Sequence, residues 1–452
     1  MANHHPQTPN RRVFLKSSSA AVAGTSLLAG LSAVSAAHVS YDETIKIGLI
    51  GCGGRGRGAA DQAMNTEGPT KLVAVADAFE DNLQSAVDGL VRQHKDKVDV
   101  PKERQFVGFD AYKKVLETDV DLVILATPPG FRPLHFEAAI NANKHVFMEK
   151  PVAVDAAGVR KVLETTRLAK EKGRAVAVGL QRHHEPIYIE TIKRLQDGEI
   201  GRIVATRAYW NGAGVWVRPR KEGQTEMEYQ MRNWYYFNWL CGDHITEQHI
   251  HNLDVINWLM GSYPVSAQGQ GGRQVRVGKE FGEIYDHHFV EFTYDNGGDR
   301  SVMLSQCRHI ENCWSEVNEF AHCSDGWCDL GNGRIFDSKG NLKWEYPRVG
   351  ADGKRIGNLH DGWQQEHHDL FADIRAGRIP NEGEYGAKSS MTSVLGRMAT
   401  YSGKEISWND AINSQLVISP VEKYTSFNDT PPVVPREDMT YDIAVPGVTK
   451  VL

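Results

Sequence analysis

A buried strand that runs straight into a glycine-rich turn is the feature that most limits how this chain can fold. The apolar run Ile45–Ile50 leads directly into Gly51-Cys52-Gly53-Gly54-Arg55-Gly56. A helical pattern follows, and a second apolar run, residues 72–76, ends at Asp77. This order of strand, glycine turn, helix and acid-terminated strand is typical of a doubly wound parallel sheet. We therefore predict an α/β class and a Rossmann domain over residues 44–151.

Each glycine of this turn has a separate physical role in binding a dinucleotide. Gly51 permits the tight turn, Gly53 lets backbone amides approach the pyrophosphate, and Gly56 lets the helix pack close to the sheet. The N-terminus of that helix favours the phosphate charge. Gly54 and Arg55 complete the turn, so all five residues are predicted to bind the cofactor.

Asp77 decides which dinucleotide the turn favours. It follows Gly51 by 26 residues, where its carboxylate would accept hydrogen bonds from the adenosine ribose hydroxyls. An acid here repels a 2′-phosphate, and the next residues, Ala78 and Phe79, offer no adjacent cation. NAD is therefore favoured over NADP, although Arg55 leaves NADP open. A glycine turn that binds no nucleotide is the alternative, and the complete strand–helix–strand context disfavours it.

The first 37 residues indicate export. Arg11 and Arg12 stand in the sequence RRVFLK, ahead of a weakly apolar run rich in Ala, Ser and Gly that ends in small residues suited to signal peptidase. This pattern predicts a twin-arginine signal peptide over residues 1–37, transport in the folded state, and a periplasmic or other extracytoplasmic location. A membrane-spanning helix is the alternative, but so many small residues make a poor anchor, and no other stretch is long and apolar enough.

Charge and cysteine content narrow the partners. Residues 1–37 carry three cations and no acid, so their removal takes the formal net charge from −6 to about −9, which argues against nucleic acid and anionic membranes as partners.

Four of the six cysteines, Cys307, Cys313, Cys323 and Cys328, cluster in a strand-rich segment. One or two disulfides there would suit an oxidising compartment, whereas zinc would need tighter CxxC-type spacing.

A lysine stands at the end of another predicted strand. Residues 120–126 form a buried strand that opens into Thr127-Pro128, and after a helical pattern the next strand ends in Glu149-Lys150-Pro151. This places Lys150 at the carboxyl edge of the sheet, where doubly wound folds bind ligands. Taken alone, such a lysine is more often a solvated surface residue.

At this point the chain resembles the Gfo/Idh/MocA oxidoreductases. The resemblance rests on the glycine turn, Thr127-Pro128, His135 and Glu149-Lys150-Pro151, and it extends to about Ser414. It implies that Lys150 lies beside the nicotinamide and hydrogen-bonds the reacting hydroxyl. It also implies a second, α+β domain over residues 152–425 with a large, open, mainly antiparallel sheet. The further site residues that follow from it are Thr127, Pro128 and Glu149 for the cofactor and Arg182 for the substrate.

Local patterns in the second domain agree with that implication. Residues 159–173 read as a helix, residues 175–179 as a strand, and residues 202–211 alternate as a strand does. Residues 286–294 and 301–308 flank the turn Asp-Asn-Gly-Gly, which predicts a β-hairpin.

The most informative helix is predicted over residues 243–259. Glu247, His251 and Asp254 are spaced i, i+4, i+7 and share one face. The family pattern is Asp, three residues, His, two residues, Asp, so this chain carries Glu247 where the first Asp belongs. The extra methylene displaces the carboxylate, and catalytic geometry is sensitive to such a change. We predict catalytic roles for His251 and Glu247 and a substrate contact for Asp254.

Two alternatives for this helix stay open. His251 could be a histidine satisfied by Asp254. A metal could be held by His244, Glu247, His249 and His251, but these side chains do not share one face and no HExxH motif is present. We therefore assign no metal.

An aromatic insertion, residues 212–240, lies between the predicted strand and this helix. It contains Trp216 and Trp234, and aromatic faces stack on the C–H faces of sugar rings, so we predict a substrate contact for Trp234. A packed loop or subunit contact is an equal alternative. The tail, residues 426–452, contains several prolines and looks extended, suited to wrapping a neighbour in a homo-oligomer.

These observations favour an exported oxidoreductase acting on a secondary alcohol of a sugar or cyclitol. Free nicotinamide cofactor is not expected outside the inner membrane, so the NAD should stay tightly bound and be regenerated in the site. One alternative is hydrolysis by transient oxidation, which resembles the NAD-dependent glycosidases of glycoside hydrolase family 109. The other is a sugar-binding or assembly protein without catalytic activity.

Overall fold

The computed structural model describes residues 43–350, 353–354, 356 and 358–452. The predicted signal peptide, residues 1–37, lies outside the described residues. The first half of the fold consists of β1 (Ile45–Ile50), α1 (Gly54–Met64), β2 (Thr70–Asp77), α2 (Glu80–Gln93), β3 (Gln105–Val107), α3 (Ala111–Leu116), β4 (Leu122–Leu125), α4 (Arg132–Asn141), β5 (His145–Met148), α5 (Ala156–Glu171) and β6 (Val176–Val178).

These strands form a six-stranded parallel sheet in the order β3-β2-β1-β4-β5-β6. β4 and β5 are buried at every position, as expected for parallel strands covered by helices on both faces. The Rossmann domain is therefore confirmed, but its predicted end at residue 151 falls short. The strand at residues 175–179 was expected in the second domain, whereas β6 pairs with β5 and completes the first sheet.

The second domain is built on a nine-stranded sheet in the order β14-β13-β12-β11-β7-β10-β9-β8-β15. Its strands are β7 (Ile203–Gly212), β8 (Ser266–Gly272), β9 (His287–Asn296), β10 (Asp299–His309), β11 (Glu316–Cys323), β12 (Gly326–Asp329), β13 (Arg334–Asp337), β14 (Leu342–Glu345) and β15 (Ile406–Ser407). β7 and β10 run parallel, and the other neighbours are antiparallel. The predicted open, mainly antiparallel sheet is confirmed.

The hairpin β9–β10 follows from its turn residues. Gly297 and Gly298 have φ angles of 73° and 99°. A two-residue turn of this kind needs positive φ at both central positions, which glycine adopts without strain. The predicted hairpin is therefore present, and its strands extend to Asn296 and Asp299 on either side of the turn.

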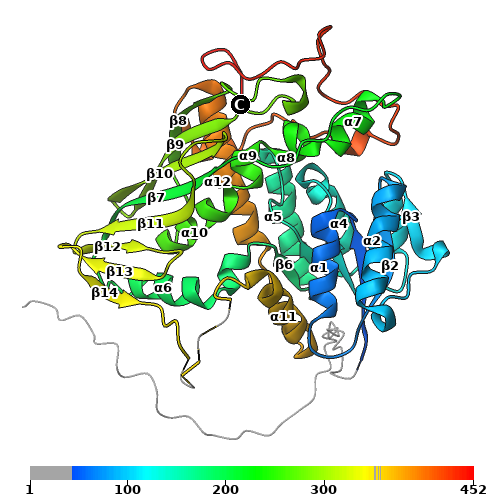
Figure 1. Cartoon of the computed structure of the whole chain (residues 1–452), viewed down its shortest axis with the longest axis horizontal. Helices are drawn as coiled ribbons and strands as arrows, with labels where there is room; N and C mark the ends of the chain where they lie inside the picture. The colour runs from blue at the N-terminus through cyan, green and yellow to red at the C-terminus, as the bar shows by residue number, and fades with distance from the viewer. Residues whose placement is uncertain (1–42, 351–352, 355, 357) are drawn as a thin grey trace, which may run out of the picture. The chain divides into compact units, whose positions relative to one another are not determined.

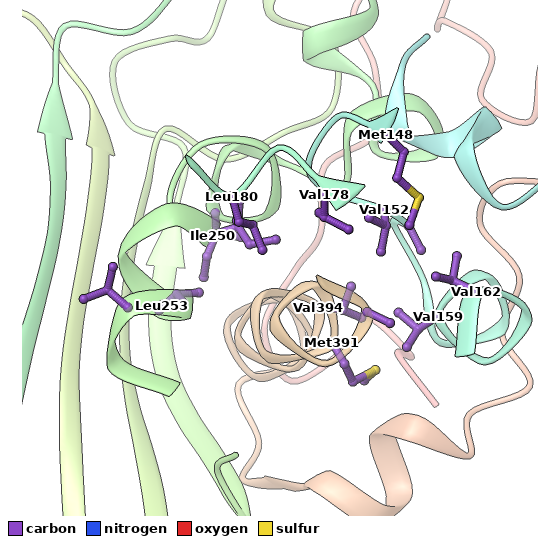
Figure 2. Close-up of a cluster of buried hydrophobic side chains, with 14 of the residues drawn as sticks. Met148, Val152, Val159, Val162, Val178, Leu180, Ile250, Leu253, Met391 and Val394 are labelled. Atoms are coloured by element: carbon purple, nitrogen blue, oxygen red, sulfur yellow. The ribbon is translucent and has the colours of Figure 1, made fainter. Parts of the chain in front are cut away.

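Among the described residues, the second domain contains eight α-helices, and one of them, α12, packs between the two sheets. They are α6 (Pro186–Gln196), α7 (Glu226–Arg232), α8 (Asn238–Cys241), α9 (His244–Glu247), α10 (Ile250–Met260), α11 (Gly362–Arg375), α12 (Gly383–Ser402) and α13 (Trp408–Ile412). Figure 1 shows α12 between the Rossmann elements and the nine-stranded sheet. In Figure 2 its residues Met391 and Val394 lie between α5 and α10, so one apolar core continues from one domain into the other.

The tail lies along its own chain. It has no helix or strand after residue 427, as its prolines predict. Gln230 donates a 2.7 Å hydrogen bond to the Val433 carbonyl, and Tyr441 donates one of 2.6 Å to Glu226. The segment that the tail wraps here is therefore the chain's own insertion.

The described residues bear on the cysteines and on membrane-spanning helices. All six cysteines are free thiols, so the disulfides left open for Cys307, Cys313, Cys323 and Cys328 are not formed. Cys307 and Cys328 are instead buried in the apolar core. Within residues 43–452 as described, no helix has the length and apolarity needed to cross a bilayer.

Candidate active site

A cavity of about 740 Å³ lies at the carboxyl ends of β1, β2 and β4. Its volume is in the range of sites that enclose organic ligands. The wall includes predicted cofactor residues from the glycine turn and the following strands, namely Gly51, Gly53, Gly54, Arg55, Asp77, Thr127 and Pro128. Gly56 lies beneath this wall, where a Cβ would stand 1.9 Å from the Gly51 carbonyl oxygen. The cradle thus fits a dinucleotide, with Gly56 in the packing role expected of it.

Asp77 is fixed at the end of β2. Its carboxylate accepts hydrogen bonds from the backbone amides of Cys52 (2.6 Å) and Phe79 (2.8 Å). Burial raises the pKa of Asp77, and these two amides oppose the rise. The side chain is therefore held on the cavity wall, where an adenosine ribose would meet it.

Arg55 is held by two polar side chains. Its Nε lies 2.5 Å from Glu149 Oε1, and its Nη2 donates a 2.8 Å hydrogen bond to Gln62. Glu149 follows β5, three positions across the sheet from the β2 end that carries Asp77. Arg55 is thus engaged by Glu149 at the β5 end of the sheet, while it also lines the cavity that contains Asp77.

Lys150 and Glu247 form a buried pair. The Lys150 ammonium donates one hydrogen bond to the Glu247 backbone carbonyl and lies 3.0 Å from the Glu247 carboxylate, and the two side chains are 11% and 9% exposed. Burial raises the pKa of Glu247, and Lys150 opposes the rise. Glu247 therefore contacts the predicted catalytic lysine despite its extra methylene.

A break in the predicted helix makes this pair possible. The helix expected over residues 243–259 is divided into α9 and α10, separated by Gln248 and His249. The His251 amide bonds to the Gln248 carbonyl at 3.3 Å and leaves the Glu247 carbonyl available to Lys150. The single continuous helix was therefore a wrong prediction.

His251 is buried and uncharged. Burial lowers its pKa well below the usual value, and the positive charges of Lys150, Arg182 and Arg55 lower it further. Its Nδ1 has no hydrogen-bond partner among the described residues, and its ring stacks on Trp210 with centroids 5.8 Å apart. A neutral imidazole with a free nitrogen is able to accept a proton.

Two predicted substrate residues are engaged elsewhere. Asp254 lies 2.8 Å from His183 Nε2 and accepts a 2.7 Å hydrogen bond from Ser389, so it neither satisfies His251 nor reaches the cavity. Arg182 forms an ion pair with the fully buried Glu319. Asp254 and Arg182 are therefore held by buried partners in this structure, and their contacts with a substrate stay predictions.

The position of Trp234 bears on its predicted contact with the substrate. It lines the dinucleotide cavity, whereas Lys150, Glu247 and His251 are not on that wall. Lys150 follows the end of β5, Glu247 pairs with it, and the charge of Lys150 acts on His251. The aromatic insertion therefore forms part of the wall of the cofactor crevice, and the contact of Trp234 with a substrate stays a prediction.

One buried cluster has the composition of a metal site. The possible ligand atoms of Asp243, His244 and His288 lie within 4.8 Å of one another. The Asp243 carboxylate, however, already accepts hydrogen bonds from the Tyr401 hydroxyl (2.5 Å) and the Tyr285 amide (3.0 Å). Because the Asp243 carboxylate is already the acceptor for two neighbouring donors, a structural role suits it better than metal binding. In the alternative set weighed from the sequence, Glu247 contacts Lys150 and His249 contacts Ser305.

One buried cation was missed from the sequence. Arg132, at the start of α4, is 1% exposed, and burial lowers its pKa to about 10. Its electrostatic partners are Glu149 and Glu247. No local pattern distinguishes it from a surface arginine in the first turn of a helix.

A glycine-lined cavity at the carboxyl ends of β1, β2 and β4, together with a buried lysine–carboxylate pair after β5 and a neutral histidine, is the arrangement expected of a nucleotide-dependent oxidoreductase. Residues 45–180 match the model of the oxidoreductase family with an NAD-binding Rossmann fold, and residues 188–327 match that of the GFO/IDH/MocA C-terminal domain. The chain belongs to the Gfo/Idh/MocA oxidoreductase family.

Among curated proteins, the chain is similar to inositol 2-dehydrogenases. One from Rhizobium meliloti is 26% identical over 59% of this chain and 69% of the relative. One from Salmonella paratyphi B is 28% identical over 48% of this chain, and the match spans only 55% of the relative's length.

Solved structures share the fold. An aldose-aldose oxidoreductase from Caulobacter crescentus has a TM-score of 0.61 at 19% identity, covering 81% of this chain and all of the other. The scyllo-inositol dehydrogenase from Lactobacillus casei with NAD(H) and scyllo-inositol has a TM-score of 0.60 at 18% identity, with the same coverage.

Proposed function

We propose that this protein oxidises a secondary alcohol of a sugar or cyclitol, using NAD that it retains between turnovers. The observation that carries the proposal is the buried Lys150–Glu247 pair. Lys150 lies close enough to the uncharged His251 for its positive charge to lower the pKa of the histidine. Membership of an oxidoreductase family and similarity to inositol 2-dehydrogenases support the same chemistry.

Each residue has a definite part in this reaction. His251 accepts the hydroxyl proton, and Lys150 stabilises the negative charge that develops on the oxygen. Glu247 holds the lysine in place through two oxygens of one residue. NAD, when bound, supplies the carbon that accepts the hydride. Loss of a proton and a hydride converts the alcohol to a ketone.

The direct test is the variant Lys150→Ala. We expect NADH formation with a panel of inositols and sugars to fall about 100- to 1,000-fold, because the charge on the oxygen is no longer stabilised. Bound NAD, measured after denaturation, should be retained. Lys339→Ala, on an exposed turn, is the matched control. Wild-type rates in the Lys150 variant would remove the lysine from the mechanism.

We further propose that the protein is exported by the twin-arginine route and works in the periplasm. The support is the RRVFLK sequence and the small-residue run after it. A cofactor that cannot be exchanged there must be reoxidised in the site, and a second sugar or ketone that takes back the hydride and a proton would do so. Replacing Arg11 and Arg12 by Lys should hold the protein in the cytoplasm, as cell fractionation would reveal.

Enclosure of the cofactor crevice by the insertion also favours a second candidate, hydrolysis by transient oxidation. In that cycle the hydride returns to the same sugar after the glycosidic bond is eliminated. Aryl glycosides separate the two candidates, because hydrolysis would release the aryl alcohol with no net NADH. A sugar-binding protein without catalysis would give neither signal and would tolerate loss of both Lys150 and His251.

A further inference from the structure

The insertion, residues 212–240, forms the second wall of the dinucleotide cavity. Across from the glycine turn and Asp77, the wall is made by side chains of the C-terminal domain, among them Trp216, Arg218, Lys221, Arg232 and Trp234. In Figure 1, α7 of this insertion and the red tail lie above the blue Rossmann helices. Elements of both domains thus surround one cavity.

One contact closes the insertion onto the Rossmann domain. Arg232, the last residue of α7, places its guanidinium 4.0 Å over the ring of Phe79 and 3.0 Å from the Asp81 carboxylate. Glu228 fixes the same arginine from within α7, at 2.9 Å. Phe79 and Asp81 directly follow Asp77, so this latch of Arg232, Phe79 and Asp81 lies over the adenosine side of the crevice.

The tail reinforces the latch. Phe427 stacks on Phe79 with ring centroids 5.0 Å apart, and it meets Phe109 edge-on at 5.1 Å. Thr225, which precedes α7, donates a 2.5 Å hydrogen bond to the Phe427 carbonyl. The insertion is therefore held from both sides, by the Rossmann loops and by the end of the chain.

Two cations on this wall have no acidic partner. Arg218 and Lys221 line the cavity, are exposed, and form no ion pair within the part of the chain that the structure describes. Arg218 lies 5.3 Å over Trp216, which orients it. Across the cavity, Arg55 is engaged by Glu149, and Asp81 is engaged by Arg232. A pyrophosphate bound at the glycine turn needs positive charge, and these two side chains are the free source of it on the opposite wall.

We propose that the insertion is a cofactor-binding strap: Arg218 and Lys221 bind the bridging phosphates of the dinucleotide, and the latch slows its release. This inference rests on the proposed NAD-dependent function. It assigns cofactor retention to the second domain of the same chain.

The phosphate contacts are tested with the double variant Arg218→Ala/Lys221→Ala. The variant removes two charged hydrogen-bond donors to the bridging phosphates, so we expect its affinity for NAD to fall about 10- to 100-fold. NAD and NADP should lose affinity by the same factor, since both carry the bridging phosphates. A loss confined to NADP would place these cations at a 2′-phosphate and overturn the assignment. Unchanged affinity for both nucleotides would overturn it as well.

The latch is tested by release kinetics of the holoprotein. NADH dissociation, followed by the loss of its fluorescence after displacement with excess NAD, should be about ten-fold faster in Arg232→Gln and in Asp81→Asn. Arg334→Gln breaks an exposed 2.9 Å pair with Glu345 on the far sheet edge and is the matched control. Circular dichroism confirms that each variant is folded. Equal release rates in wild type and both latch variants would refute the strap.

Failure of this inference is distinguishable from failure of the proposed function. A wild-type protein that loses NAD on gel filtration yet oxidises polyols when NAD is added has no strap but has the activity. A wild-type protein that keeps its NAD and oxidises nothing retains the strap and lacks the activity.

Discussion

At the scale of single residues, the site depends on where Glu247 presents its two acceptors. Its carbonyl and its carboxylate both contact Lys150. The position of Lys150 was predictable because the end of a parallel strand is a position that sequence patterns locate well, whereas its predicted role came from the family resemblance. The partners of Asp254 and Arg182 were not predictable, because His183 and Glu319 are distant in sequence and only the packed fold brings them near.

The length of Glu247 can be tested by shortening it. In Glu247→Asp the carboxylate no longer reaches a lysine that is anchored by the backbone carbonyl, so we expect kcat to fall about 100-fold. The amount of NAD that stays bound to the purified variant should equal that of the wild type. Glu247→Gln keeps the length and loses the charge, and we expect an intermediate rate. Glu311→Asp, an exposed site, controls for the substitution itself. An Asp variant as fast as wild type would show that the pair does not position the lysine.

The charge state of His251 predicts the pH dependence of the reaction. Because burial and nearby cations lower its pKa, the imidazole stays neutral and able to accept a proton well below pH 6.5. We expect kcat/KM to be flat as pH falls from 8 to 6.5 and to decline only in more acidic buffer. His251→Asn should remove this acid limb together with most of the rate. A decline centred at or above pH 6.5 would contradict a depressed pKa.

At the scale of elements, local signals located strands and turns but not the break between α9 and α10. No Gly or Pro stands at Gln248 or His249 to announce it. At the interruption the Glu247 carbonyl accepts a hydrogen bond from Lys150, which is distant in the sequence. Likewise, the pattern of β6 identified a strand but not the sheet to which it belongs, since pairing depends on the whole topology.

The glycine turn offers a prediction in which two similar changes act differently. Gly56→Ala puts a methyl group 1.9 Å from the Gly51 carbonyl, so the helix must move off the sheet. Overpacking of this kind costs about 1–3 kcal/mol, and both Tm and NAD binding should fall. At Gly53 a Cβ meets no atom within 4 Å, yet the residue lines the cavity. Gly53→Ala should keep the Tm of the nucleotide-free protein and lose NAD affinity. Identical behaviour of the two variants would contradict these separate roles.

At the scale of the whole molecule, the two-domain plan was predictable and the use of the insertion was not. Aromatic and basic residues suit a sugar and a dinucleotide equally well by composition. Which ligand they meet depends on the placement of residues 212–240 over the crevice, and that placement is set by contacts such as Arg232 with Asp81 and Phe427 with Phe79. A functional residue on a long insertion is therefore assigned only after the fold is known.

The pH dependence of stability also belongs to the whole molecule, because buried groups of opposite effect contribute to it. His145 is 4% exposed, accepts a 2.9 Å hydrogen bond from the Ala175 amide, and has its pKa lowered to about 4, mainly by burial. Below pH 6.5 the unfolded chain binds a proton at this residue that the folded protein does not. Its contribution to stability is thus complete above pH 6.5 and is lost as pH falls towards 4. Glu283 acts in the other direction, because burial raises its pKa to about 7, so its contribution is lost as pH rises through 7.

Because these contributions oppose each other, the informative quantity is the free energy of unfolding of the wild type minus that of a variant lacking one of the two side chains. We expect the free energy of unfolding of wild type minus that of His145→Gln to shrink between pH 6.5 and 4.5, by up to about 1.4 kcal/mol per pH unit. The same difference for Glu283→Gln should grow as pH falls from 7 towards 4.5. Urea unfolding in buffers from pH 4.5 to 8 measures both. A neutral buried histidine and a neutral buried carboxylic acid give slopes of opposite sign in these two plots against pH. If both differences in unfolding free energy change in the same direction with pH, one of the two side chains is charged in the folded protein.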